Sequence, residues 1–426
     1  MQKHCLIQPE RSRLQSVAHY AGAVVALCVC VLAAISSGSA GASRLLSEYG
    51  SAADSLAATK RALDFNPNDP DAHYHYAVRL ADTGNAEAAL AEFEQAAKLR
   101  PSDYFLWQEL GRARDDNEDA RGAISALQKA IELAPQYAQA HWLVGNILLR
   151  NNDPEAAFSE MRLAVKSDPT LLPLLLDLAW GFSEGNSQFV VNALAPASDR
   201  ERVNLARFLI GHGQIKDSVD LVQRAQQIST DDSRVLVADL LAKQEFTAAH
   251  NVWLKGRGDD AQTELVDGDF ELPVTAGNQG FGWRPTQLTQ TVHILVDPND
   301  PQSGKRSLRV EYAGNFETGQ PVISQLVVLP PHTRYRLTFS ARTENLVSGA
   351  LPLIAVSDAK SNQIICQTEP LAAGTNAWRE FSLDFETATG DAVLIRIQRQ
   401  SCAVQPCPIF GRAWYDNFSI ISGLPS

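Results

Sequence analysis

The stretch ALAEFEQAAKLRPSDYFLW, residues 89–107, contains an amphipathic run that ends at a proline, and an aromatic-rich run begins within three residues. The same stop recurs along the chain at Pro67, Pro101, Pro135 and Pro169, each 34 residues after the previous one. Proline lacks a backbone N–H and disfavours helix in the residue before it. A proline at this fixed interval therefore predicts a helix that ends once in every 34 residues.

Other residue types keep the same interval. Small residues, alanines and larger apolar residues each recur in phase, at Ala77, Gly111 and Gly145; at Ala89, Ala123 and Ala157; at Ala96, Ala130 and Ala164; and at Phe93, Leu127 and Met161. A small residue lets two helices approach closely, and the larger apolar residues fill the space between units. One such unit cannot bury its apolar face alone, so the units are expected to stack.

A 34-residue period with small residues at fixed places and a terminal proline resembles the tetratricopeptide repeat, which has two antiparallel helices per unit. Full repeats are expected at 70–103, 104–137 and 138–171, and residues 52–66 read as the second helix of a partial repeat. Less regular helix pairs follow after residue 172. The resemblance implies an α-solenoid over residues 52–256.

The hydrophobic pattern changes after a polar linker at 257–264. Short segments then alternate apolar and polar residues or run β-branched, which is typical of strands; they lie at 307–312, 322–330, 335–343, 351–358, 381–387 and 393–400. About ten such strands in residues 265–424 predict a β-sandwich of the jelly-roll type. The fold class is therefore a multidomain α plus β protein, with a solenoid followed by a sandwich.

The second domain has a resemblance of its own. VDGDFELP (266–273), GW (282–283), SGKRSLRVEY (303–312) and AWYDNFSI (413–420) resemble the galactose-binding-like carbohydrate-binding modules. The resemblance implies a structural calcium ion held by Glu271 and Asp416, for which hard oxygen ligands are suited. The alternative is that these carboxylates only accept hydrogen bonds that close strands.

Glycan binding by such a module needs exposed aromatic rings on which sugars stack, together with polar partners for the hydroxyl groups. The candidates are Trp283, Tyr312 and Tyr335, with Trp378 and Trp414 as further aromatic residues. The competing interpretation places Trp283, Trp378 and Trp414 in the core.

Repeat arrays of this family bind extended peptides on the concave side, which is lined by the first helix of each repeat. The phase of the repeat assigns six residues to this groove: Tyr74, Val78, Gln108, Arg112, Trp142 and Asn146. Packing of Trp142 inside the array is the alternative. The lysine and asparagine pattern that captures a carboxylate tail is absent from these positions, apart from Asn146.

The N-terminus combines a basic lead, residues 1–19, with an apolar segment at 20–42. We expect this segment to be an uncleaved signal anchor, since it reaches about 20 residues. The alternative is a signal peptide cleaved after Ala40-Gly41-Ala42; a lipoprotein site at Cys28 fits the pattern less well. Positive charge before the segment predicts export of the rest of the chain to the cell envelope, anchored or, after cleavage, secreted or periplasmic.

The net charge of the chain argues against one class of partner, and its cysteines indicate one covalent link. The formal net charge of −12 argues against general nucleic-acid binding, which needs a basic surface. Cys402 and Cys407 close a short loop and are expected to pair in an oxidising compartment, although Cys366 could compete for either.

These observations favour a non-enzymatic, envelope-associated scaffold. Its groove would bind a protein partner and its sandwich a glycan or protein, in the assembly or export of a surface polysaccharide. A second hypothesis is a polysaccharide-active enzyme, for which Asp384 and Glu386 alternate onto one side of a strand. A third is a structural assembly factor that binds protein only.

Overall fold

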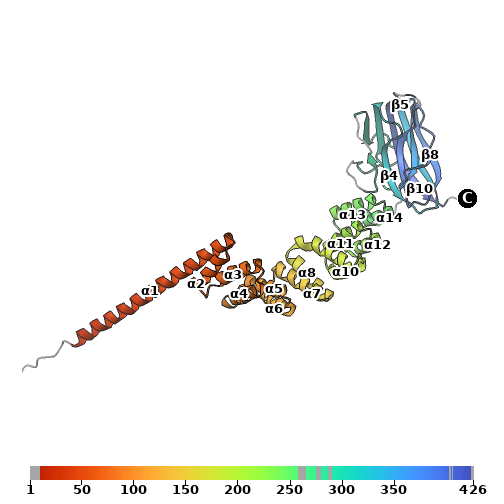
Figure 1. Cartoon of the computed structure of the whole chain (residues 1–426). Coiled ribbons are helices and arrows are strands. Elements are labelled where there is room, and N and C mark those ends of the chain that lie inside the picture. Colours follow the sequence, from red (N-terminus) through yellow and green to blue (C-terminus); the bar gives the residue numbers. More distant parts are fainter. Residues whose placement is uncertain are drawn as a thin grey trace, which may run out of the picture. The chain divides into compact units, whose positions relative to one another are not determined.

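The computed structural model describes residues 10–257, 265–274, 280–285, 290–402, 404 and 406–423, with side chains from residue 23 onward. Within this part of the chain, helices fill the N-terminal region and two antiparallel sheets the C-terminal region, as the sequence predicts (Figure 1). The chain divides into two compact units, Met1–Leu194 and Ala195–Ser426, so the boundary falls inside the expected solenoid. The expected linker at 257–264 lies, from residue 258 on, outside the described residues.

The helices form successive pairs. Their bounds are α1 Glu10–Ala52, α2 Leu56–Phe65, α3 Pro70–Asp82, α4 Ala86–Leu99, α5 Tyr104–Asp116, α6 Ala120–Leu133, α7 Ala138–Arg150, α8 Pro154–Ser167, α9 Leu172–Phe182, α10 Ser187–Leu194, α11 Asp199–Gly211, α12 Ile215–Arg224, α13 Thr230–Ala242 and α14 Phe246–Arg257. The hairpins α3/α4, α5/α6 and α7/α8 coincide with the three predicted repeats. The expected stack of hairpins at 70–171 is confirmed.

The in-phase residues act as the sequence predicts. The alanines of the second helices are buried, and Gly111 lies so close to Leu127 that a Cβ at this position would stand 2.6 Å from the Leu127 Cγ. A hydrogen bond also links each repeat to the proline that ends the repeat before it. In each case a ring nitrogen contacts the proline carbonyl oxygen: His73 Nε2 and Pro67 O at 2.9 Å, Trp107 Nε1 and Pro101 O at 2.9 Å, and His141 Nε2 and Pro135 O at 3.3 Å. The period is therefore fixed both by packing and by polar contacts.

Helix α1 differs from expectation. The sequence indicates only the second helix of a partial repeat at 52–66, but α1 runs on as one helix to Ala52 and packs on α2 and α3 (Figure 1). Ser43 and Ser47 are buried, and the Ser43 hydroxyl donates a 2.9 Å hydrogen bond to the Asp69 carboxylate. The end of α1 is thus the first helix of the first hairpin. From Ala23 onward α1 is long and apolar enough to cross a membrane, with a mean hydropathy of 2.2 in its most apolar stretch.

The sandwich contains two five-stranded antiparallel sheets, ordered β1-β4-β9-β6-β7 and β2-β3-β10-β5-β8. The strands are β1 Arg284–Pro285, β2 Val292–Asp297, β3 Ser307–Asn315, β4 Pro321–Val328, β5 Arg334–Ser348, β6 Pro352–Asp358, β7 Ile364–Gln367, β8 Gly374–Glu386, β9 Ala392–Arg399 and β10 Pro408–Ser422. The six segments read as strands from the sequence are β3, β4, β5, β6, β8 and β9. Their inward apolar side chains form one core between the sheets.

Within the second unit, α14 packs against the sandwich. The Thr247 backbone N–H and hydroxyl donate to the Asp391 carboxylate at 3.1 and 2.6 Å. The rings of His250 and Trp253 lie 4.8 and 5.5 Å from Phe281. The sandwich therefore covers an apolar face of the last helix, as a capping unit does in a repeat array.

Candidate functional site

The first candidate surface is the one for which the sequence predicts a groove, with residues on α3, α5 and α7. The structure buries the Gln108 side chain and packs Tyr74 and Val78 against the core of the first repeats. The Tyr74 ring meets Phe105 edge-on at 5.4 Å, and burial, with the charge of Glu109, raises the pKa of its hydroxyl. The side chains of these three residues are less exposed than their phase predicts, because the next repeat covers them.

The remaining groove positions are accessible. Arg112 is exposed on α5 and lies 3.6 Å from Glu109, while Trp142 and Asn146 are half-buried one turn apart on α7. Phe105 lies two turns before Arg112 and is partly exposed, but sequence reasoning missed it. Its spacing from Arg112, seven residues, was the available signal. We name Phe105, Arg112, Trp142 and Asn146 the repeat surface.

The aromatic residues expected to bind glycan are not accessible. Trp283, Tyr312 and Tyr335 are all buried, so none of them presents a ring face to a ligand. Trp283 donates a 3.0 Å hydrogen bond to the Asp267 carbonyl oxygen and packs on Phe270. This corrects the sequence-based assignment: these rings build the sandwich core.

Trp414 and Trp378 lie instead on the outer side of the sheet β2-β3-β10-β5-β8, on either side of Arg342. The Arg342 guanidinium stands 4.0 Å from the Trp414 ring centre and 5.5 Å from that of Trp378. The Trp414 indole N–H donates to the Asp297 carboxylate at 2.9 Å. Trp414 is covered by these groups, whereas Trp378 remains half-buried.

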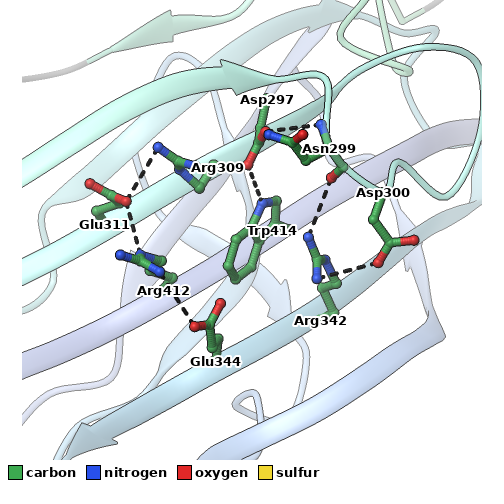
Figure 2. A network of polar contacts seen from close by, with 9 residues as sticks. All are labelled: Asp297, Asn299, Asp300, Arg309, Glu311, Arg342, Glu344, Arg412 and Trp414. Atoms are coloured by element: carbon green, nitrogen blue, oxygen red, sulfur yellow. Dashed lines mark hydrogen bonds and ion pairs between the residues drawn. The ribbon is translucent and has the colours of Figure 1, made fainter.

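A chain of alternating charges crosses the same face, as Figure 2 shows. We call it the charge ladder; its ion pairs are Asp297–Arg309 at 2.9 Å, Arg309–Glu311 at 3.3 Å, Glu311–Arg412 at 2.9 Å and Arg412–Glu344 at 3.4 Å. Burial alone would raise the pKa of Asp297, but hydrogen bonds from Trp414 and Asn299 and the charge of Arg309 lower it overall. The ladder therefore holds ionised groups in place on an open sheet face.

A hollow of about 290 Å³ adjoins the charge ladder, with His293, Glu311, Glu344, Asn345 and Arg412 in its walls. Gly411 forms part of its floor at φ +106°, where a Cβ would collide with the Asn345 carbonyl oxygen. The hollow thus depends on a glycine at a strand irregularity between Phe410 and Arg412.

Apolar side chains lie next to this hollow. Phe410 and Val347 are paired neighbours on β10 and β5 and are 50% and 63% exposed. Sequence reasoning missed Phe410 and Arg412, although both alternate with the buried Ile409 and Ala413. A flat exposed ring beside fixed carboxylates and guanidinium groups has the mixed character of a site for polar, hydroxylated ligands.

The two proposed calcium ligands, Glu271 and Asp416, accept hydrogen bonds from backbone amides. Asp416 accepts hydrogen bonds from the Gln302 and Ser303 amides at 2.8 and 2.9 Å, and Glu271 accepts from the Lys305 and Arg306 amides. Among the described residues, no group of three or more His, Cys, Asp or Glu side chains could hold a metal ion. In this arrangement the two carboxylates clamp one loop, residues 302–306.

Asp384 and Glu386, the carboxylates of the enzyme hypothesis, are each paired with an arginine. They lie on β8 in exposed ion pairs with Arg336 and Arg334, at 2.6 and 3.2 Å. The Arg336 hydrogen bond lowers the pKa of Asp384, which therefore is not suited to act as a general acid.

Two of the three cysteines near the C-terminus are paired. A disulfide joins Cys402 and Cys407. Cys366 on β7 carries a free, half-buried thiol, and burial raises its pKa to about 11.

Comparisons with known proteins agree with the first domain. A tetratricopeptide repeat family model matches residues 43–104 and 109–171. No curated protein matches the chain.

Several solved structures match parts of the chain. A MamA double mutant, strain RS-1, is 22% identical and covers 37% of this chain and 91% of its own, with a TM-score of 0.33. The Pseudomonas aeruginosa protein pilF is 12% identical and covers 51% of this chain and 88% of its own, with a TM-score of 0.29. A CBM22-1 xylan-binding domain from Paenibacillus barcinonensis Xyn10C is 13% identical and covers 37% and 94%, with a TM-score of 0.27.

Proposed function

We propose that this protein is a non-enzymatic scaffold of the cell envelope, held at a membrane by α1, that joins a protein partner to a glycan. The observation that carries the proposal is the tetratricopeptide repeat array at 43–171, because repeats of this kind form protein–protein interaction scaffolds. We further propose that the process served is assembly or export of a surface polysaccharide.

The protein partner is assigned to the repeat surface. Arg112 can donate to carboxylate or carbonyl oxygens, Trp142 can cover an apolar side chain, and Asn146 can bond a peptide group. An extended segment running across α5 and α7 would meet all three.

This part is tested by photo-crosslinking in cells. A benzophenone amino acid at Arg112 is expected to trap a defined partner, whereas the same group at Leu163, exposed on α8, is the matched control. Equal labelling from both positions would contradict the assignment of the repeat surface.

The glycan is assigned to the hollow beside the charge ladder. A sugar ring would stack on Phe410, and its hydroxyl groups would bond to Glu311, Glu344 and Arg412, whose positions are already fixed by one another. Preorganised partners lower the entropic cost of binding.

A glycan array with the full chain tests this assignment. Phe410→Ala and Arg412→Ala are each expected to weaken binding at least about tenfold, and Ile421→Ala, an exposed residue of the same strand, to leave it unchanged. A blank array with the wild-type chain would favour the structural factor that binds protein only.

A further inference from the structure

We infer that α1 passes through a lipid bilayer and continues, without a linker, as the first helix of the first repeat, so that the face formed by Arg44, Leu45 and Tyr49 lies among lipid headgroups. This inference deepens the membrane attachment proposed above and rests on it. It adds an interaction surface and a fixed orientation to what was only an anchor.

The length of the apolar segment supports the first step. A bilayer core of about 30 Å needs about 20 helical residues. Residues 23–42 provide this length and contain no Asp, Glu, Lys or Arg. Their large apolar side chains, such as Val25, Leu32 and Ile35, are exposed in the protein alone. The uncharged stretch therefore runs up to Ser43, the first fully buried residue among the described side chains of α1.

The packing after Ser43 supports the second step. Ser43 and Ser47 lie one turn apart on the side of α1 that faces α2 and α3, and Ser43 bonds to Asp69, the N-cap of α3. The helix continues through this region to Ala52 with no intervening turn. A direction fixed by packing after residue 43 is therefore passed rigidly to the residues before it.

The opposite side of α1 supplies the third step. Leu45 and Tyr49 are 71% and 63% exposed, and Arg44 and Glu48 are exposed beside them. Among the described residues, the helices that pack on α1 are chiefly α2 and α3, on the side of Ser43 and Ser47. At about 1.5 Å per residue, Leu45 stands about 5 Å and Tyr49 about 10 Å beyond residue 42. The headgroup layer is about 5–8 Å deep on each side. Leu45 lies within it, and the Tyr49 side chain, whose Cα–Cβ bond tilts toward the helix N-terminus, points back toward it, where tyrosine is favoured.

The junction is tested by hydrogen exchange on the full chain in phosphatidylcholine–phosphatidylglycerol nanodiscs. We expect amides of residues 43–48 to be protected, and an insertion of Gly-Ser-Gly-Gly between Ala42 and Ser43 to accelerate their exchange at least about tenfold without releasing the chain. Unprotected exchange in a wild-type chain that stays in the membrane would overturn the inference and leave the attachment standing. Release by alkaline carbonate, or a mature N-terminus at residue 43, would instead overturn the attachment itself.

The headgroup contact is tested by spin labels in a chain whose free cysteines are replaced by serine. A label at Tyr49→Cys is expected to collide with a water-soluble nickel complex at least about threefold less often than one at Leu163→Cys, which lies on exposed α8. Equal collision rates would show that this face is in water and would overturn the contact.

Discussion

The Arg399 guanidinium donates a 2.8 Å hydrogen bond to the carbonyl oxygen of Cys407, within the loop closed by the Cys402–Cys407 disulfide. Arg399 is fully buried and also donates to the carbonyl oxygens of Phe316 and Ala350, at 2.5 and 3.1 Å. Burial lowers the pKa of Arg399. One side chain thus joins three loops at one end of the sandwich.

Replacing this arginine is expected to destabilise the sandwich. Arg399→Met leaves buried carbonyl groups without donors, which should lower the free energy of unfolding by about 3 kcal/mol. Arg334→Met is the matched control, because Arg334 is exposed and its ion pair with Glu386 is worth at most about 1 kcal/mol. Urea titration followed by near-ultraviolet circular dichroism measures both, and equal losses would contradict the role of Arg399.

The disulfide is expected to contribute modestly. It closes a loop of sequence separation 5, for which loop-closure entropy predicts about 2 kcal/mol. Reduction should therefore lower the unfolding midpoint, and a Cys402→Ser, Cys407→Ser chain should show no further response to reductant. A response that persists in this double variant would point to Cys366 instead.

The repeats carry an acid-sensitive contact. Arg100 donates two 2.9 Å hydrogen bonds to Asp71, and these bonds lower the pKa of that carboxyl. Because the folded pKa is depressed, the stabilisation is present above the unfolded value near 4 and is lost as the pH falls through the folded value. Between pH 5 and 2, the wild type should lose more thermal stability than Asp71→Asn. Glu155→Gln, an exposed carboxylate on α8, should behave like the wild type.

The carboxylate clamp on the 302–306 loop tests the calcium expectation. Asp416→Ala removes the acceptor for the backbone amides of Gln302 and Ser303, which should lower the free energy of unfolding by about 2–4 kcal/mol. Asp416→Asn keeps one carbonyl oxygen as an acceptor and should lower it less. Added calcium at about 1 mM should leave the unfolding midpoint of chelator-treated protein unchanged. A rise in the midpoint that Glu271→Gln abolishes would instead establish a calcium site.

The repeats could be predicted because the period is local. Each 34-residue unit repeats the same contacts, so the phase of Gly111 or Ala123 specifies its environment without knowledge of distant residues. The beginning of the array was missed because Ser43, in phase with Ala77, Gly111 and Gly145, stands directly after an apolar segment. Hydropathy made that segment look like an anchor alone.

The sites were less predictable because they depend on neighbours outside each motif. Tyr74 has the phase of a groove residue, but the ring of Phe105 from the next repeat packs edge-on against its ring. In the sandwich, alternation separates inward from outward residues but does not say which aromatic belongs to which face. Tyr312 was proposed for the surface, while its neighbour Glu311 is the residue that pairs with Arg412 there.

Gly411 offers the sharpest test of the hollow. Gly411→Ala places a Cβ against the Asn345 carbonyl oxygen in addition to the strain of a positive φ, so we expect a loss of about 3 kcal/mol or more. Gly319→Ala is the matched control, because Gly319 has φ +79° but nothing within 4 Å of an added Cβ, and should cost about 1 kcal/mol. The difference between the two variants in urea titration isolates the collision from the backbone strain. If both variants lose the same stability, β10 and β5 do not approach closely at Gly411, and the hollow cannot hold its walls at the positions that a bound glycan would need.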